Sequence, residues 1–196
     1  KRGTLAQDGE AHGGYYTKRE LGELVTYAKA RGVEVVPELD MPGHAVAMLA
    51  AYPELGCFDE PLEVATHFGV SDYSKQLLCA GKEEAFAFVC TLLEELMEVF
   101  PFPYIHIGGD EVDTGHWAGC PDCREVMRRE ELTRVKELEG YFIGRIARYL
   151  TGKGVICSLA HTNANIARAR AAVDAGARLV THLFDVFPLP AATDPD

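Results

Sequence analysis

Dense clusters of basic residues are missing from the sequence, and so are long hydrophobic runs. Thirty acidic residues against nineteen basic ones give a net charge of −11 at pH 7, which disfavours a nucleic acid partner. No apolar stretch approaches the about 18 residues that span a bilayer, so no membrane partner is expected. The chain starts at Lys1 without a signal-like segment, although a signal could lie upstream.

Cysteine is also scarce. Six cysteines in 196 residues are too few for a small domain held together by disulfides, and they do not fix the redox compartment. Cys120 and Cys123 form the motif CPDC, which could bind zinc or undergo redox cycling. No second pair lies at ligand spacing in the sequence. We therefore interpret the motif as structural, with a local disulfide or a packed thiol favoured over half of a metal site.

The apolar residues that are present follow a regular pattern. They make up 47% of the chain, enough for one compact domain with a core. A capping box formed by Thr17 and Glu20 predicts a helix that ends at Gly32. Helical spacing of apolar residues predicts further helices over 82–100, 121–150 and from Asn163 onward. Short apolar runs predict strands over 33–39, 104–108, 154–160 and 178–184, and 53–81 has the composition of a long loop.

This alternation of strands and helices predicts the α/β class, because parallel strands need crossover connections and helices supply them. A complete eight-stranded barrel takes about 250 residues, and the chain has four good strands in 196. We therefore expect a partial (β/α)8 TIM-type barrel with parallel strands. Open sheets and barrels both place function at the carboxyl ends of the strands. The polar residues that follow these strands are Asp40, His44, Asp110, Glu111, His161 and His182.

The segment IHIGGDEV ends a predicted strand with two glycines and two adjacent carboxylates. Gly108 and Gly109 leave room for a ligand to approach the backbone. Because neighbouring residues on an extended segment point in different directions, Asp110 and Glu111 can hold different roles. A carboxyl group in an apolar pocket can serve as general acid while a solvated neighbour stays ionised. A solvated acidic pair ahead of a helix is the alternative, and the spacing alone leaves both open.

Six segments in the correct order resemble the catalytic barrel of family 20 glycoside hydrolases, the β-N-acetylhexosaminidases. They are HGGYYTKREL, VVPELDMPGH, YPELGC, LCAGKEEAFAF, YIHIGGDEV and ELEGYFIGRIARYL. Together they cover residues 12 to 150, and we place the boundary of this part at residue 151. The resemblance implies hydrolysis of terminal N-acetyl-β-hexosamine residues, from N-acetylhexosaminides or chitooligosaccharides, without a cofactor.

The resemblance also implies roles for individual residues in a substrate-assisted, retaining reaction. Glu111 would protonate the glycosidic oxygen and later activate water. Asp110 would orient the substrate's 2-acetamido group, whose own oxygen attacks the anomeric carbon. His44 would hydrogen-bond the acid, although a lone histidine beside Pro-Gly is otherwise more often a loop-packing residue. Supporting or substrate-binding positions are Asp40, His106 and Trp117.

Several residues that the same resemblance implies are not found in this sequence. They include an arginine that clamps the sugar hydroxyls and an aspartate that partners the histidine, both expected upstream of Lys1. Tryptophans that enclose the sugar, and later a tyrosine and an acidic residue, are expected after Thr151. The only tryptophan is Trp117. We therefore expect these 196 residues to encode part of the pocket.

Residues 152–196 resemble a different family, N-acetylglucosamine-6-phosphate deacetylase, a metal-dependent amidohydrolase. The resemblance lies in SLAHTNANIARARAAVDAGARLVTHLF, and it implies that His161 and His182 ligate a divalent metal such as zinc. Twenty-one residues separate them, enough for one helix and one strand. Two packed histidines near strand ends are the alternative, since a metal site normally needs three protein ligands. The third ligand and the catalytic aspartate of that family are absent from this sequence.

Three hypotheses follow from the sequence. The favoured one is a β-N-acetylhexosaminidase. The second is a metal-dependent deacetylase, and the third is a sugar-binding module or an inert fragment. Either a natural gene fusion or a misjoined gene would place segments that resemble the two families in one chain.

Overall fold

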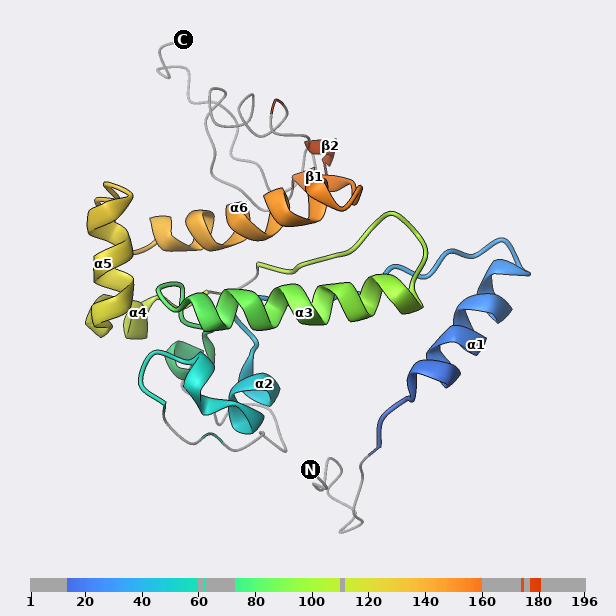
Figure 1. Cartoon of the computed structure of the whole chain (residues 1–196), viewed down its shortest axis with the longest axis horizontal. Helices are drawn as coiled ribbons and strands as arrows, with labels where there is room; N and C mark the ends of the chain where they lie inside the picture. Colours follow the sequence, from blue (N-terminus) through green and yellow to red (C-terminus); the bar gives the residue numbers. More distant parts are fainter. Residues whose placement is uncertain are drawn as a thin grey trace.

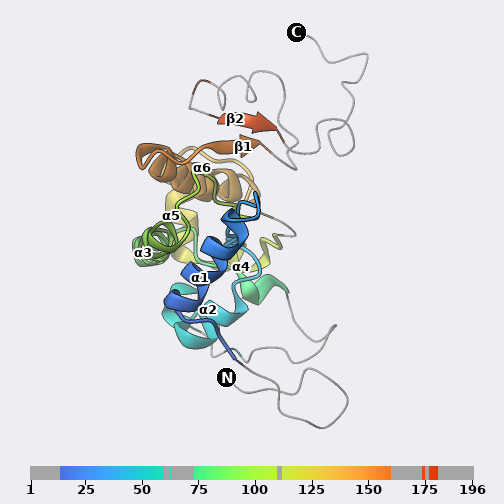
Figure 2. The same ribbon diagram turned by 90° about the vertical axis from the view of Figure 1, so that its right-hand side faces the viewer.

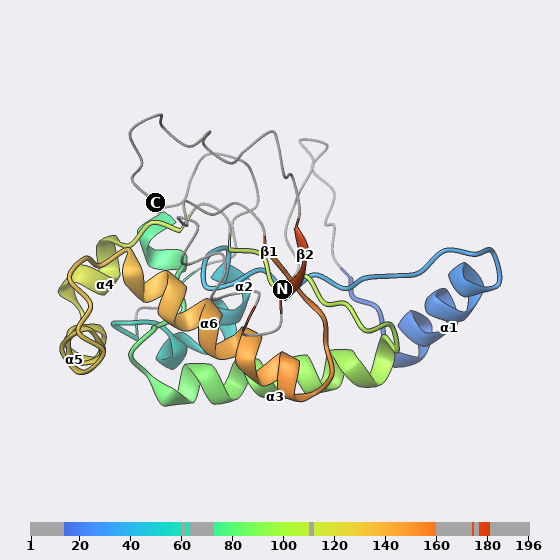
Figure 3. The same cartoon turned by 90° about the horizontal axis from the view of Figure 1, so that it is seen from above.

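The computed structural model describes residues 14–59, 62, 73–109, 112–159, 174 and 177–180. Figure 1 shows α3 and α6 side by side, and α1 apart from them at one end of the molecule; Figure 3 shows the same arrangement from above. The elements in chain order are α1 (Lys18–Lys29), α2 (Val46–Ala51), the 3-10 helices η1 (Pro53–Leu55) and η2 (Tyr73–Gln76), α3 (Glu83–Val99), α4 (Gly115–Gly119), α5 (Pro121–Arg129), α6 (Glu137–Gly152), β1 (Cys157–Leu159) and β2 (Ala177–Val180).

Helix α1 begins with the predicted capping box. The Thr17 hydroxyl accepts the Glu20 backbone N–H at 3.2 Å, and the Glu20 carboxylate accepts the Thr17 N–H at 2.7 Å. These two bonds satisfy backbone donors that a helix start leaves unpaired. The helix ends at Lys29, three residues before the predicted end, and an ion pair of 2.9 Å between Lys18 and Glu95 joins it to α3.

The predicted strands show parallel contacts in two separate pairs. Strands β1 and β2 pair in parallel, as Figure 2 shows beside α6. The Ile156 N–H, just before β1, donates to the Pro103 carbonyl at 2.9 Å. A parallel bridge joins Glu38 to His106. These contacts bring parts of the predicted strands next to one another.

The predicted strands over 33–39 and 104–108 are wrong in extent, because only the Glu38–His106 bridge forms between them. Pro37 has no N–H to contribute to a ladder, and Gly108 has a φ of +65° that ends the extended conformation. Within the described residues, the sheet itself has the two strands β1 and β2.

The predicted helix over 121–150 is also wrong as a single element, because a loop divides it into α5 and α6. Glu131 adopts a left-handed φ of 54°, and the Leu132 N–H folds back to the Met127 carbonyl at 2.8 Å. The Glu137 carboxylate then accepts the backbone N–H groups of Thr133 at 2.8 Å and Arg134 at 2.9 Å. These bonds end one helix and begin the next.

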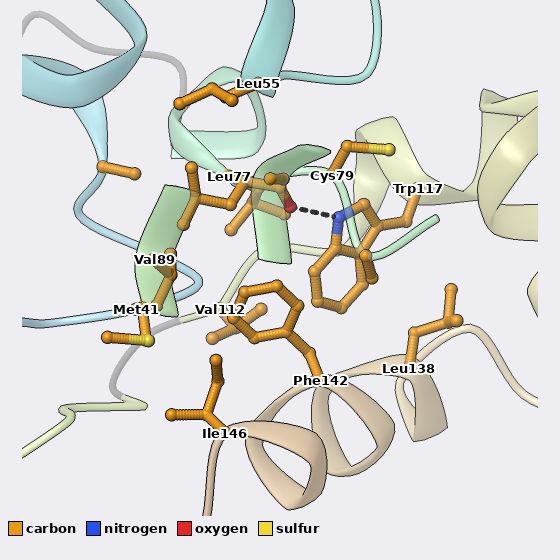
Figure 4. Packing of buried hydrophobic residues seen from close by; sticks show 14 of the residues in the cluster. Met41, Leu55, Leu77, Cys79, Val89, Val112, Trp117, Leu138, Phe142 and Ile146 are labelled. Carbon is orange, nitrogen blue, oxygen red and sulfur yellow. Dashed lines mark hydrogen bonds between the residues drawn. The ribbon is translucent and has the colours of Figure 1, made fainter. Parts of the chain in front are cut away.

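The core lies between α3, α6 and the segments that carry the strand ends (Figure 4). Helix α6 buries one face on it, formed by residues four apart in sequence: Leu138, Phe142, Ile146 and Leu150. Helix α3, which matches the predicted helix over 82–100, buries Ala85, Val89 and Leu93. In the predicted loop over 53–81, the described residues include the short helices η1 and η2. None of the described helices is long and apolar enough to cross a membrane.

The Glu137 cap predicts a dependence of stability on pH. Backbone N–H groups of Arg134 and Thr133 lower the pKa of Glu137 from 4.5 to about 2. A lowered pKa in the folded state means that this stabilisation is full above pH 4.5 and is lost as the pH falls toward 2. Glu137→Gln should therefore lower the melting temperature at pH 7, and its difference from wild type should shrink between pH 4.5 and 2.

The matched control is Glu139→Gln. Glu139 lies two residues after Glu137, and its carboxylate pairs with Lys136. Thermal unfolding of both variants, followed by circular dichroism across the pH range, measures the effect. Equal melting temperatures for the two variants at pH 7 would contradict the role given to the cap.

Candidate active site

The candidate site is built on two neighbouring backbone segments, 37–41 and 106–109. The His106 N–H donates to the Pro37 carbonyl at 3.0 Å, and the Leu39 N–H donates to the His106 carbonyl at 2.9 Å. The Met41 N–H then donates to the Ile107 carbonyl at 3.1 Å. Because both segments run in the same direction, their carboxyl ends meet at one edge. This edge holds the predicted residues Asp40 and His106.

The Asp40 side chain reaches across this edge to the neighbouring segment. Its Oδ1 accepts the Gly109 N–H at 3.0 Å. A Cβ added at Gly108 would lie 1.6 Å from the same oxygen and 2.7 Å from the Asp40 Cα. We expected Gly108 to admit a ligand, but Asp40 occupies that space. At Gly109, with a φ of +106°, an added Cβ would meet no atom within 4 Å.

His44 lies in the turn that follows Asp40. Its Nε2 is 3.8 Å from Asp40 Oδ2, and its φ of 49° is unusual for a residue with a side chain. The turn is tied to the chain ahead of α3, since the Leu78 N–H donates to the Pro42 carbonyl at 2.9 Å. The peptide bond between Met41 and Pro42 is cis. The fold thus brings the predicted Asp40 and His44 together.

His106 stabilises the turn that contains the two glycines. Its Nδ1 accepts the Gly108 N–H at 3.2 Å. Glu38 Oε1 lies 3.3 Å from the same Nδ1. Glu38 was not among the predicted site residues, although it lies in a predicted strand beside the one that holds His106.

Asp110 and Glu111, the predicted catalytic pair, lie outside the described residues. The residues on both sides of the pair are described. Gly109 is held by Asp40, and Val112 is buried in the core with its carbonyl accepting a hydrogen bond from Lys136 Nζ at 3.3 Å. The chain is therefore anchored immediately before and after the pair. His161 and His182 lie outside the described residues as well.

Trp117 is fully buried in the core. Its Nε1–H donates to the Leu78 carbonyl at 3.0 Å, and Figure 4 shows its ring packed above Phe142 and Leu138. An indole with its ring covered and its N–H paired has no surface for a sugar. We expected Trp117 in a supporting or substrate-binding position, and the structure gives it a packing role.

Comparison with known proteins identifies the family. Residues 1–163 match the catalytic domain of glycosyl hydrolase family 20. The chain belongs to this family. The match extends past residue 151, where we expected the first family resemblance to end.

Individual relatives agree with this assignment. A β-hexosaminidase of Akkermansia muciniphila is 44% identical over 148 residues, which cover 75% of this chain and 29% of the relative. The crystal structure of a β-N-acetylhexosaminidase from Bacteroides fragilis is 39% identical with a TM-score of 0.69, covering 80% of this chain and 30% of that one. An exo-β-N-acetylglucosaminidase from Vibrio harveyi, in complex with N-acetylglucosamine, is 29% identical with a TM-score of 0.68, covering 80% and 24%. The chain spans less than a third of the length of these relatives.

The close approach of Asp40 to Gly108 predicts that alanine is not tolerated at this position. In Gly108→Ala the added methyl group meets Asp40 at a positive φ, so it must displace the carboxylate that holds Gly109. We expect a loss of about 1–3 kcal/mol in the free energy of unfolding. Gly140→Ala is the control, because a Cβ at this helical position meets nothing within 4 Å and alanine favours the helix by about 1 kcal/mol. Urea unfolding compares the two; a neutral Gly108→Ala contradicts the packing described.

Proposed function

We propose that the chain is the part of a glycoside hydrolase that carries its acid pair, and that it removes terminal N-acetyl-β-hexosamine residues. Membership of glycosyl hydrolase family 20 is the observation on which this proposal rests. The relatives named above are β-hexosaminidases and β-N-acetylglucosaminidases. We further propose that the parallel segments at 37–41, 103–107, β1 and β2 form part of a barrel wall.

In the proposed reaction, Glu111 is the general acid and base, and the substrate supplies the nucleophile. Glu111 protonates the leaving oxygen while the 2-acetamido oxygen attacks the anomeric carbon, and Glu111 then removes a proton from the water that opens the cyclic intermediate. Asp110 orients the acetamide group through its N–H. This division of roles explains why the two acids are adjacent without acting as an acid and nucleophile pair.

The described geometry supports precise placement of this acid pair. Catalysis by positioned groups is sensitive to errors of about 1 Å, and here the chain is fixed at Gly109 and again at Val112. We propose Asp40 as the residue that positions the backbone ahead of Asp110. His44, 3.8 Å from Asp40, is proposed to hydrogen-bond and tune the acid.

The proposed substrates are N-acetylhexosaminides, including chitooligosaccharides. The Vibrio harveyi relative holds N-acetylglucosamine in its structure, which supports a sugar of this type. Because the acetamide oxygen is the nucleophile, a substrate with a hydroxyl in its place should not react. Neither the attack nor the return of water in this scheme needs a metal or an organic cofactor.

Release of the aryl group from an aryl N-acetyl-β-glucosaminide tests the proposal. Glu111→Gln cannot transfer the proton, and we expect the rate to fall about 100-fold or more. Asp110→Asn should also slow turnover, because the acetamide is no longer polarised. Glu84→Gln, on the exposed first turn of α3, is the control and should retain the wild-type rate. The aryl β-glucoside should not be hydrolysed by any of these proteins.

Two results would oppose the proposed activity. Turnover that survives Glu111→Gln would remove Glu111 from the mechanism. A melting temperature raised by N-acetylglucosamine, without turnover of the aryl substrate, would favour a sugar-binding module, the third hypothesis from the sequence.

A second candidate function concerns the segment after residue 151. Strands β1 and β2 pair in parallel, with Leu159 opposite Val180, so the chain leaves both strands at the same edge. His161 and His182 follow these strand ends by two residues each. This arrangement supports the proposal that the two histidines bind a divalent metal, as the resemblance to N-acetylglucosamine-6-phosphate deacetylase implies.

Metal analysis tests this second function. A chain with a histidine metal site should lose about one metal ion in His161→Ala and in His182→Ala. It should also release acetate from N-acetylglucosamine 6-phosphate, and metal removal should stop this release. Deacetylation by metal-free protein, or an unchanged metal content in both variants, would exclude the metal-dependent deacetylase.

A further inference from the structure

Four cysteine side chains from three separate parts of the chain meet in one cluster. Cys57 follows η1, Cys79 lies between η2 and α3, and Cys120 and Cys123 lie at the start of α5. All four sulfurs lie within 4.8 Å of one another. We propose that these four cysteines form a structural zinc site, with one Zn²⁺ ion bound by four thiolates.

The distances between the sulfurs fit a tetrahedral metal site. Cys79 Sγ lies 3.6 Å from Cys123 Sγ and 3.7 Å from Cys120 Sγ, and Cys57 Sγ lies 3.9 Å from Cys123 Sγ. A zinc ion about 2.3 Å from four tetrahedral sulfurs holds them about 3.8 Å apart. A disulfide would bring two sulfurs to about 2.05 Å. The spacing therefore matches shared coordination of an ion and excludes a disulfide between these sulfurs.

Hydrogen bonds independent of the sulfurs bring the cysteines together. The Cys79 N–H donates to the Leu55 carbonyl at 2.8 Å, which places Cys79 beside the segment that leads to Cys57. The Trp117 indole donates to the Leu78 carbonyl, which places the end of α4 and the start of α5 beside Cys79. Figure 4 shows Cys79 and Trp117 next to each other at this end of the core. The ligands are therefore positioned in advance by the fold.

Gly81 allows this close approach. A Cβ at Gly81 would lie 2.3 Å from the Asp122 carbonyl carbon and 2.5 Å from the Cys123 nitrogen. The turn after Cys79 thus packs directly on the backbone between Cys120 and Cys123, where a side chain would separate the two pairs of ligands. A glycine with an ordinary φ, needed only for space, is typical of sites where two backbones meet.

The cluster is largely buried and lies at the start of α5. Cys120 is the N-cap of α5 and Cys123 lies in its first turn, where the helix dipole favours negative charge. Cys79, Cys120 and Cys123 are fully buried, and Cys57 is half-buried. Buried thiolates need a cation, and zinc replaces the thiol protons on binding.

Four protein ligands make the site structural. A catalytic zinc keeps an open position for water or substrate, whereas four cysteines close the coordination sphere. The site would join the loop after η1, the segment ahead of α3 and the start of α5. We therefore expect zinc to contribute to folding stability and to take no part in glycoside hydrolysis.

Metal content is the first test. The 196-residue chain, purified without metal-affinity resin and analysed by elemental mass spectrometry, should contain about one zinc per chain at the cysteine site. Cys120→Ser and Cys123→Ser should each lose this zinc. Cys90→Ser is the matched control, because Cys90 lies on α3 outside the cluster and should retain it. His161→Ala should also retain it, which separates this site from the proposed histidine site.

A second test uses the unmodified chain, so it does not require any variant to fold. It combines spectroscopy with thermal unfolding. Cobalt(II) exchanged for zinc should give thiolate-to-metal charge-transfer absorption and the strong visible bands of a tetrahedral ion. Removal of zinc by a chelator should lower the melting temperature, and added zinc should restore it.

Four results would overturn the proposal. They are zinc retained in both Cys120→Ser and Cys123→Ser, a melting temperature insensitive to chelation, iron in place of zinc, and an intact mass that shows disulfides among these cysteines. None of these outcomes depends on glycosidase activity, so failure of the zinc site and failure of the proposed hydrolase function can be told apart.

Discussion

The hydrogen bond from the Gly109 N–H to Asp40 Oδ1 organises the candidate active site. It joins the ends of two segments that share a single β-bridge. A side-chain hydrogen bond therefore links the two segments beyond this bridge. The contact is possible only because residue 108 has no Cβ. Gly108 therefore acts indirectly: it makes room for Asp40, and Asp40 in turn fixes the backbone immediately before Asp110.

Local patterns predicted those parts of the fold that local forces determine. The Thr17 capping box and the helix over 82–100 are confirmed, because side-chain caps and helical spacing act within a few residues. The break between α5 and α6 was missed. Its apolar spacing continues through the loop, while the cap is made by one carboxylate, Glu137, bonding backward to Thr133 and Arg134.

For the candidate site, too, the sequence pattern predicted some features and missed others. Parallel strand ends predict that Asp40 and His44 lie at one edge, since a shared edge follows from chain direction alone, whereas His106 was indicated only by the family resemblance. Burial of Trp117 and the four-cysteine cluster could not be predicted in this way. Cys57 and Cys123 are 66 residues apart, and Cys79 and Cys123 are 44 apart. Within the sequence, CPDC has no partner pair, because its partners are two single cysteines brought in by separate backbone contacts.

One short segment links the cysteine cluster to the candidate active site. The Leu78 N–H donates to the Pro42 carbonyl in the turn that holds His44, and the Leu78 carbonyl accepts the Trp117 indole N–H. Cys79, the next residue, has its sulfur in the cluster. Leu78 and Cys79 therefore contact both the His44 turn and the cysteine cluster. The two sites are built on two consecutive residues of one segment, without any ligand shared between them.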